Sequence, residues 1–120
     1  MLAYNCLEWA EIYAATAKAG LMAVPVNFRL TGAEVLYIIS NAEAAAVIVQ
    51  DELTGTLEDV RHNLPVADGR FIRFGSTPCP AGYRDYETFL ALGRDSEPEL
   101  DVLLRDPWTL MYTSGTTGNP

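Results

Sequence analysis

The chain has 120 residues, enough for one small domain and too few for two. Its 49% hydrophobic and 20% charged residues are typical of a globular protein rather than a disordered one. The net charge is −8, and Lys18 is the one lysine among eight basic residues. This charge argues against nucleic acid or an anionic membrane as a partner, but not against ATP, which backbone N–H groups and Mg²⁺ can hold.

Two further signals concern the cellular compartment. Cys6 and Cys79 lie far apart and in no metal-ligand spacing, so we expect reduced thiols and no metal site. No basic stretch precedes an apolar run at the start, and no apolar run reaches the about 18 residues that a membrane span needs. These features favour a cytoplasmic protein without a transmembrane segment.

Three stretches show helical periodicity. The first runs from Asn5 to Gly20, with Asn5 and Glu8 spaced as a capping box, and has so little polar surface that we expect a mostly buried helix. Thr31 and Glu34 form a second capping box ahead of the next periodic stretch. The predicted helices cover residues 5–20, 31–42 and 53–64.

Short apolar runs separate these helices and predict buried strands, the first of which carries Pro25 and so belongs at a sheet edge or strand end. Strands that alternate with helices predict an α/β fold, with a parallel or mixed sheet, helices on its faces and ligands at the carboxyl ends of the strands. The expected strands are 21–26, 45–49, 71–74 and 108–112; the second half adds a loop at 75–82, a helix at 86–92 and a solvated acidic connector at 95–101.

The last predicted strand leads into a loop rich in glycine and hydroxyl side chains. Its sequence is Tyr112-Thr113-Ser114-Gly115-Thr116-Thr117-Gly118-Asn119-Pro120. Glycines let a ligand approach the backbone, successive N–H groups can form an anion site, and the hydroxyls add donors. The spacing is not that of a Walker A loop. Composition alone leaves two interpretations open, an anion-binding loop and a flexible turn.

The run over residues 112–120 resembles the signature loop of the adenylate-forming superfamily, which includes acyl-CoA synthetases, peptide-synthetase adenylation domains and luciferases. In that family the motif continues with Lys-Gly. A second stretch, Lys-Ala-Gly at 18–20 and Val-Pro-Val-Asn-Phe-Arg-Leu-Thr at 24–31, looks like the segment that precedes the loop in fatty-acyl- and aryl-CoA synthetases. The resemblance covers nearly the whole chain and is weakest over 75–105.

The resemblance implies a two-step reaction. ATP and a fatty or aromatic carboxylic acid give an acyl-adenylate and pyrophosphate, and the thiol of coenzyme A then displaces AMP. It implies ATP and Mg²⁺ as cofactors and coenzyme A as co-substrate, with no catalytic or metal-binding residue within this chain. The implied ATP phosphate-binding residues are Thr113, Ser114, Gly115, Thr116, Thr117 and Gly118.

The resemblance also predicts the domain organisation. We expect residues 1–120 to be an incomplete segment of the large N-terminal AMP-binding domain, without the family's C-terminal domain, and the chain alone to show no turnover. Two alternatives remain open: a truncated remnant with no activity of its own, and a fragment of an amino-acid adenylation domain. The acid and the acceptor, coenzyme A or a carrier-protein thiol, are also open.

The remaining residues that could carry chemistry are expected to be structural. His62 lies on the polar side of the third helix with no catalytic partner nearby in sequence, so we expect a surface residue. Arg29 could pair with a carboxylate or touch a ligand, and a structural role is favoured. Asp51 and Glu52 begin the third helix, where acidic residues suit the helix dipole.

Overall fold

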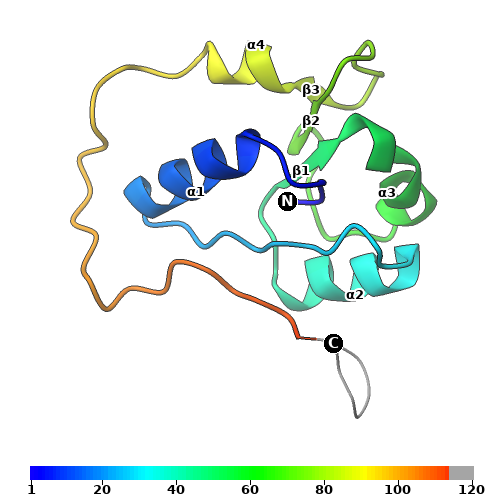
Figure 1. The fold of residues 1–120 in the computed structure, drawn as a ribbon, viewed down its shortest axis with the longest axis horizontal. Helices are drawn as coiled ribbons and strands as arrows, with labels where there is room; N and C mark the ends of the chain where they lie inside the picture. Colours follow the sequence, from blue (N-terminus) through cyan, green and yellow to red (C-terminus); the bar gives the residue numbers. More distant parts are fainter. Residues whose placement is uncertain (114–120) are drawn as a thin grey trace.

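A parallel three-stranded sheet lies at the centre of the molecule (Figure 1). The computed structural model describes residues 1–113. The strands are β1 (Val47–Gln50), β2 (Phe71–Phe74) and β3 (Arg84–Asp85), in the order β1-β2-β3. Val47 pairs with Phe71, so that β1 and β2 begin and end together. The predicted α/β fold with a parallel sheet is confirmed.

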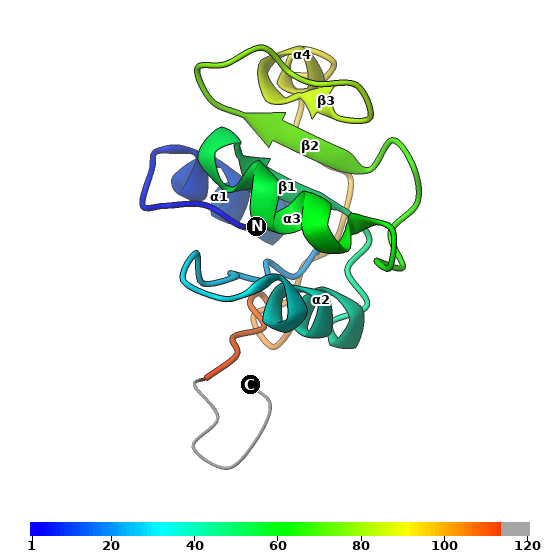
Figure 2. The same ribbon diagram turned by 90° about the vertical axis from the view of Figure 1, so that its right-hand side faces the viewer.

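Helices cover both faces of this sheet. Figure 2 shows α3 in front of β1 and α1 behind it. One buried cluster joins α2 and α3 to the sheet, and a smaller one joins α1 and α4 to its other face. Each helix among residues 1–113 falls short of the length and apolarity that crossing a bilayer requires. The helices are α1 (Glu8–Lys18), α2 (Gly32–Asn41), α3 (Thr54–Arg61) and α4 (Tyr86–Leu90).

The predicted second and third helices are confirmed, together with the signals that start them. Thr31 accepts a hydrogen bond from the Glu34 amide, and the Glu34 carboxylate accepts one from the Thr31 amide at 2.8 Å. This capping box fixes the first turn of α2, because it satisfies backbone donors that the helix leaves unpaired. A short 3₁₀ turn, Asp51–Leu53, precedes α3, and Leu57 of α3 is fully buried.

Helix α1 differs from its prediction in both its start and its burial. It begins at Glu8 with Leu7 at the cap position, so Asn5 lies outside it and forms no capping box. Ile12 is the one buried residue of the helix, and Leu7 is 75% exposed. The many apolar residues of this segment predicted too much burial, because only one side of α1 contacts the sheet. Trp9 and Tyr13 instead stack on each other, with ring centres 5.5 Å apart.

The stretches expected as strands at 21–26 and 108–112 are extended but pair only at single positions, so those two predictions are wrong as regular strands. Ala23 bridges Thr109, and Val26 bridges Leu2, which in turn bridges Val49. Pro25 has no N–H to offer, and a ladder cannot continue through it. These bridges nevertheless align the chain ahead of residue 113 with the rest of the sheet.

Candidate functional site

The segment that enters the predicted phosphate loop is held from two sides. Ala23 donates its N–H to the Trp108 carbonyl at 2.9 Å, and Leu110 donates to the Ala23 carbonyl at 3.0 Å. The Tyr112 hydroxyl donates to Asn41 Oδ1 at 2.6 Å. Thr113, which follows, is exposed. The backbone of Ala23 and the side chain of Asn41 in helix α2 therefore both contact this short segment.

Of the six predicted phosphate-binding residues, Thr113 alone lies among the described residues. The other five, Ser114, Gly115, Thr116, Thr117 and Gly118, lie outside them. The phosphate site therefore stays a prediction from the sequence, with the position of its first residue known.

A cavity of about 330 Å³ lies beside Thr113. Its walls come from the start of the chain, from the turn that follows Pro25, and from residues 111–113. Asn5 and Asn27 are polar residues of its lining, and the rings are those of Trp9, Phe28 and Tyr112. The lining residues are Ala3, Asn5, Trp9, Pro25, Val26, Asn27, Phe28, Leu30, Ile38, Met111, Tyr112 and Thr113.

Arg29 lies next to this cavity in sequence but is not one of its lining residues. Its guanidinium lies 5.2 Å from the centre of the Phe28 ring, and its backbone N–H donates to Asn27 Oδ1 at 3.0 Å. The ion pairs found among residues 1–113 do not include Arg29. The aromatic contact agrees with a structural role.

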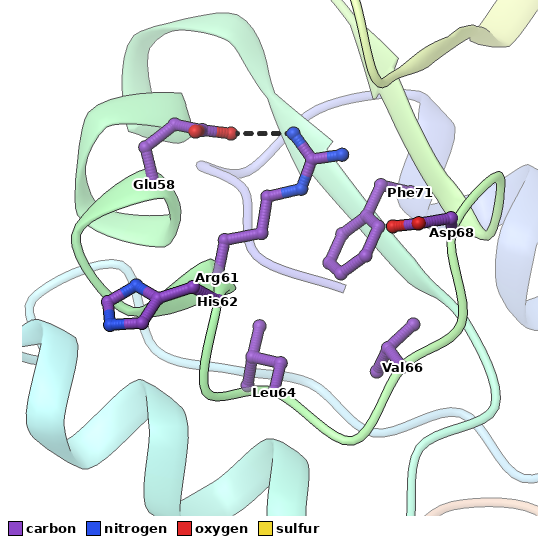
Figure 3. A pocket seen from close by; sticks show the side chains of 7 residues that line it. All are labelled: Glu58, Arg61, His62, Leu64, Val66, Asp68 and Phe71. Carbon is purple, nitrogen blue, oxygen red and sulfur yellow. Dashed lines mark hydrogen bonds and ion pairs between the residues drawn. The ribbon is translucent and has the colours of Figure 1, made fainter.

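A second, more open groove of about 430 Å³ lies at the end of α3 (Figure 3). Arg61 occupies one side of it and pairs with Glu58 at 3.0 Å. Its other terminal nitrogen donates to the Gly82 carbonyl at 2.6 Å, and its guanidinium lies 4.5 Å from the ring centres of both Phe71 and Tyr83. Since Arg61 pairs with Glu58 of α3 and also donates to the Gly82 carbonyl, it holds the loop before β3 against α3.

The electrostatics of this groove follow from the same contacts. The hydrogen bond from Tyr83 and the nearby Arg61 lower the pKa of the Glu58 carboxyl. Burial, and then the contact with Glu58, raise the pKa of the Tyr83 hydroxyl. His62 also lines the groove and is exposed, as expected. We find no arrangement here that would make His62 a general base.

A buried charge pair that the sequence interpretation missed joins the carboxyl ends of β1 and β2. Arg73 of β2 is 6% exposed and donates from Nε to Thr54 Oγ1 at 3.1 Å and from Nη1 to the Thr77 carbonyl at 2.9 Å. Asp51 Oδ2 lies 3.9 Å from Arg73 Nη2. The same oxygen accepts hydrogen bonds from the Ser76 amide at 2.9 Å and the Thr77 amide at 3.2 Å. We call Asp51, Arg73, Ser76 and Thr77 the strand-end clasp.

Asp51 and Glu52 begin the helical segment ahead of α3, as expected, and the clasp gives Asp51 a second role. Its carboxylate faces the loop after β2, and the hydrogen bond with Glu52, then those from Thr77 and Ser76, lower its pKa to about 2. Gly75 has a φ of 140°, and a Cβ there would lie 2.1 Å from the Asp51 carboxyl carbon. The sequence signal that could have revealed the clasp is an arginine inside the apolar run 71–74 that predicts a strand, because an arginine buried with such a strand needs partners.

Comparison with known proteins places this chain in a family. The profile of the AMP-binding enzyme family matches residues 1–120. The chain is 30% identical to the medium-chain-fatty-acid–CoA ligase of Ectopseudomonas oleovorans, over 99% of this chain and 22% of that protein. It is also 30% identical to the indoleacetate–CoA ligase of Aromatoleum aromaticum, over 99% of this chain and 23% of that protein.

A solved structure shows the same likeness in three dimensions. The crystal structure of the anthranilate CoA ligase AuaEII in complex with anthranoyl-AMP matches with a TM-score of 0.90 at 28% identity, over 99% of this chain and 23% of that one. The chain therefore spans about a fifth of the length of these relatives. Since the family profile covers the chain from its first residue to its last, the protein belongs to the AMP-binding enzyme family.

Proposed function

We propose that this chain contributes to the ATP-dependent activation of a carboxylic acid, first to an acyl-adenylate and then to an acyl-CoA, as part of a longer enzyme. The observation that carries the proposal is the family match over all of residues 1–120, which includes the hydroxyl- and glycine-rich loop. The relatives described above are named as CoA ligases, which favours coenzyme A as the acceptor over amino-acid adenylation.

The proposed role of the chain is to hold ATP while the acid reacts. A carboxylate oxygen attacks the α-phosphorus, and pyrophosphate leaves; the thiolate of coenzyme A then attacks the acyl carbon, and AMP leaves. Most of the rate enhancement in such transfers comes from positioning and from neutralising phosphate charge. We assign that task to Thr113, Ser114, Gly115, Thr116, Thr117 and Gly118, whose hydroxyls and N–H groups can donate to phosphate oxygens.

Magnesium is implied as the partner of ATP, but the described residues do not supply a site for it. No group of three or more metal-ligating side chains occurs among residues 1–113. We therefore assign no Mg²⁺ ligand to this part of the chain. The acid is proposed only as a class, because the named relatives act on fatty, indole-acetic and anthranilic acids.

A hybrid enzyme tests the proposal. Residues 1–120 replace the matching segment of the medium-chain-fatty-acid–CoA ligase of E. oleovorans, and acid-dependent ATP–pyrophosphate exchange and thioester formation are measured. We expect the hybrid to catalyse both. Ser114→Ala, which removes a donor to phosphate, should lower kcat/KM for ATP about tenfold or more. The matched control is Ser96→Ala, since Ser96 is exposed on the acidic connector.

The outcomes separate cleanly. A hybrid that unfolds cooperatively but shows no exchange contradicts the proposal and favours the non-catalytic remnant. If the large graft does not fold, a shorter graft of residues 107–120 alone gives the same comparison between Ser114→Ala and wild type. An equal effect of Ser114→Ala and Ser96→Ala would remove the loop from the proposed site.

A further inference from the structure

We propose that the hydrogen bond between Tyr112 and Asn41 is a positioning contact that sets where the phosphate loop begins. The inference rests on the proposed function, because it assigns to α2 a part in ATP binding. Tyr112 and Asn41 lie 71 residues apart in sequence, and their side chains meet at 2.6 Å. Thr113, the first residue of the predicted loop, directly follows Tyr112, so a displacement of Tyr112 moves Thr113.

Helix α2 is a rigid mount for this contact. The Thr31 capping box fixes its beginning, and Val35, Ile38 and Ile39 are buried along its length. Asn41 is its last residue, so the side chain that receives the Tyr112 hydroxyl projects from an element whose position is set by core packing. Sites built on such elements are held more tightly than sites supported by loops alone.

Tyr112 itself is placed by packing as well as by its hydroxyl. The ring is partly buried and packs against the larger core cluster. Burial, followed by the neighbouring Tyr37, raises the pKa of the Tyr112 hydroxyl, so the group remains a protonated donor at neutral pH. The hydroxyl can therefore donate to Asn41 across the physiological pH range.

The other end of the same segment has a second fixed point. Trp108 packs edge-on against Tyr13 of α1, with ring centres 5.5 Å apart, and donates from its indole nitrogen to the Tyr13 carbonyl at 3.3 Å. The backbone pair with Ala23 lies between these two fixed points. Within residues 108–113, Tyr112 makes the side-chain hydrogen bond nearest the loop, which makes it the contact with most influence on Thr113.

The expected consequence of losing the contact is weaker ATP binding. A segment released at Tyr112 samples more positions, and the apparent affinity falls in proportion to the fraction of time spent in the competent one. A neutral hydrogen bond at this site corresponds to a change of about three- to tenfold. Once ATP is bound, the same phosphate contacts form in the variant as in wild type. We therefore expect kcat to change less than KM for ATP.

The experiment uses the active hybrid ligase described above and compares Tyr112→Phe, Asn41→Ala and the double variant. Each single variant should raise KM for ATP about three- to tenfold while kcat stays within about twofold. The double variant should be no worse than the single variants, because both remove the same interaction. Asn41→Asp keeps an acceptor for the hydroxyl and should restore KM for ATP.

A matched control separates this role from general stability. Tyr86→Phe removes another tyrosine hydroxyl contact, to Glu11 of α1 at 2.8 Å, and α4 lies on the opposite side of Figure 1 from the segment that leads to residue 113. It should leave KM for ATP unchanged even if the melting temperature falls. KM for ATP within twofold of wild type in both Tyr112→Phe and Asn41→Ala overturns the inference, as does a double variant whose effect equals the product of the singles. An inactive but folded wild-type hybrid instead contradicts the proposed function itself.

Discussion

The molecule contains two regions of similar apolar content that behave in opposite ways. In β2, all four residues are buried, including Arg73. In the run over residues 100–104, at the end of the connector, four of five residues are apolar and all five are exposed, with Leu104 fully so. Burial thus depends on which other elements pack against a segment and not only on its amino-acid composition. Even a charged residue is buried where a sheet and a helix enclose it.

The sharpest test of this contrast exchanges a large side chain for alanine in each region. Phe71→Ala should lower the free energy of unfolding by about 4 kcal/mol, because Phe71 is 2% exposed and the cavity cannot close around β2. Leu104→Ala should change it by no more than about 0.5 kcal/mol. Urea unfolding followed by tryptophan fluorescence measures both. Similar losses in the two variants would mean that the connector is packed in solution.

A smaller effect is expected at the strand-end clasp. Asp51→Asn leaves the buried Arg73 charge without its counter-ion and should cost about 3 kcal/mol of unfolding free energy. The matched control is Asp101→Asn, because Asp101 is an exposed acid of the connector. The same unfolding assay applies, and a change below about 1 kcal/mol for Asp51→Asn would show that the other partners of Arg73 suffice.

The pH dependence refines this prediction. The pKa of Asp51 is lowered in the folded state to about 2, so its contribution is present above the ordinary carboxyl pKa near pH 4 and is lost as the pH falls towards 2. This contribution is about 2 kcal/mol. The stability difference between wild type and Asp51→Asn should therefore shrink between pH 4 and pH 2. A difference that stays constant would assign the effect to packing rather than to charge.

The weakest expected effect is in the connector. Lys18 and Glu97 form an ion pair at 2.5 Å, but their side chains are 59% and 74% exposed. Glu97→Gln should change the unfolding free energy by less than about 0.5 kcal/mol, since solvent and salt screen such pairs. Glu99→Gln is the control, and thermal unfolding at low and high salt is the measurement. A clear, salt-sensitive loss in Glu97→Gln alone would show that this pair fixes the connector on α1.

Local signals in the sequence predicted local structure well. The Thr31–Glu34 spacing gave the start of α2, and a short apolar run gave the bounds of β2. The family was likewise recognisable, because the loop after Tyr112 has a rare composition, and the family match confirms it. Each of these depends on residues within a few positions of one another.

The failures concern contacts between distant parts of the chain. Asp51 meets Ser76 and Thr77 across a whole helix and strand, and Tyr112 meets Asn41 across 71 residues. Hydrophobic periodicity carries no information about contacts between residues so far apart in sequence. The clasp and the contact of Tyr112 with Asn41 therefore could not be predicted. The two-residue strand β3 was missed for another reason: it is too short to show alternation.

The strand-end clasp also has a consequence for the order in which the chain folds. Its hydrogen bonds span 25 and 26 residues and close one β–α–β unit, whereas the contact of Trp108 with α1 spans 95. Closing a longer loop costs more entropy before any contact repays it. The β1–α3–β2 unit is thus expected to assemble early. The segment over residues 108–113, which leads into the phosphate loop, is expected to dock last. The unit that assembles first should also open least often. Amide protons of residues 47–74 should therefore exchange with solvent more slowly than those of residues 91–110.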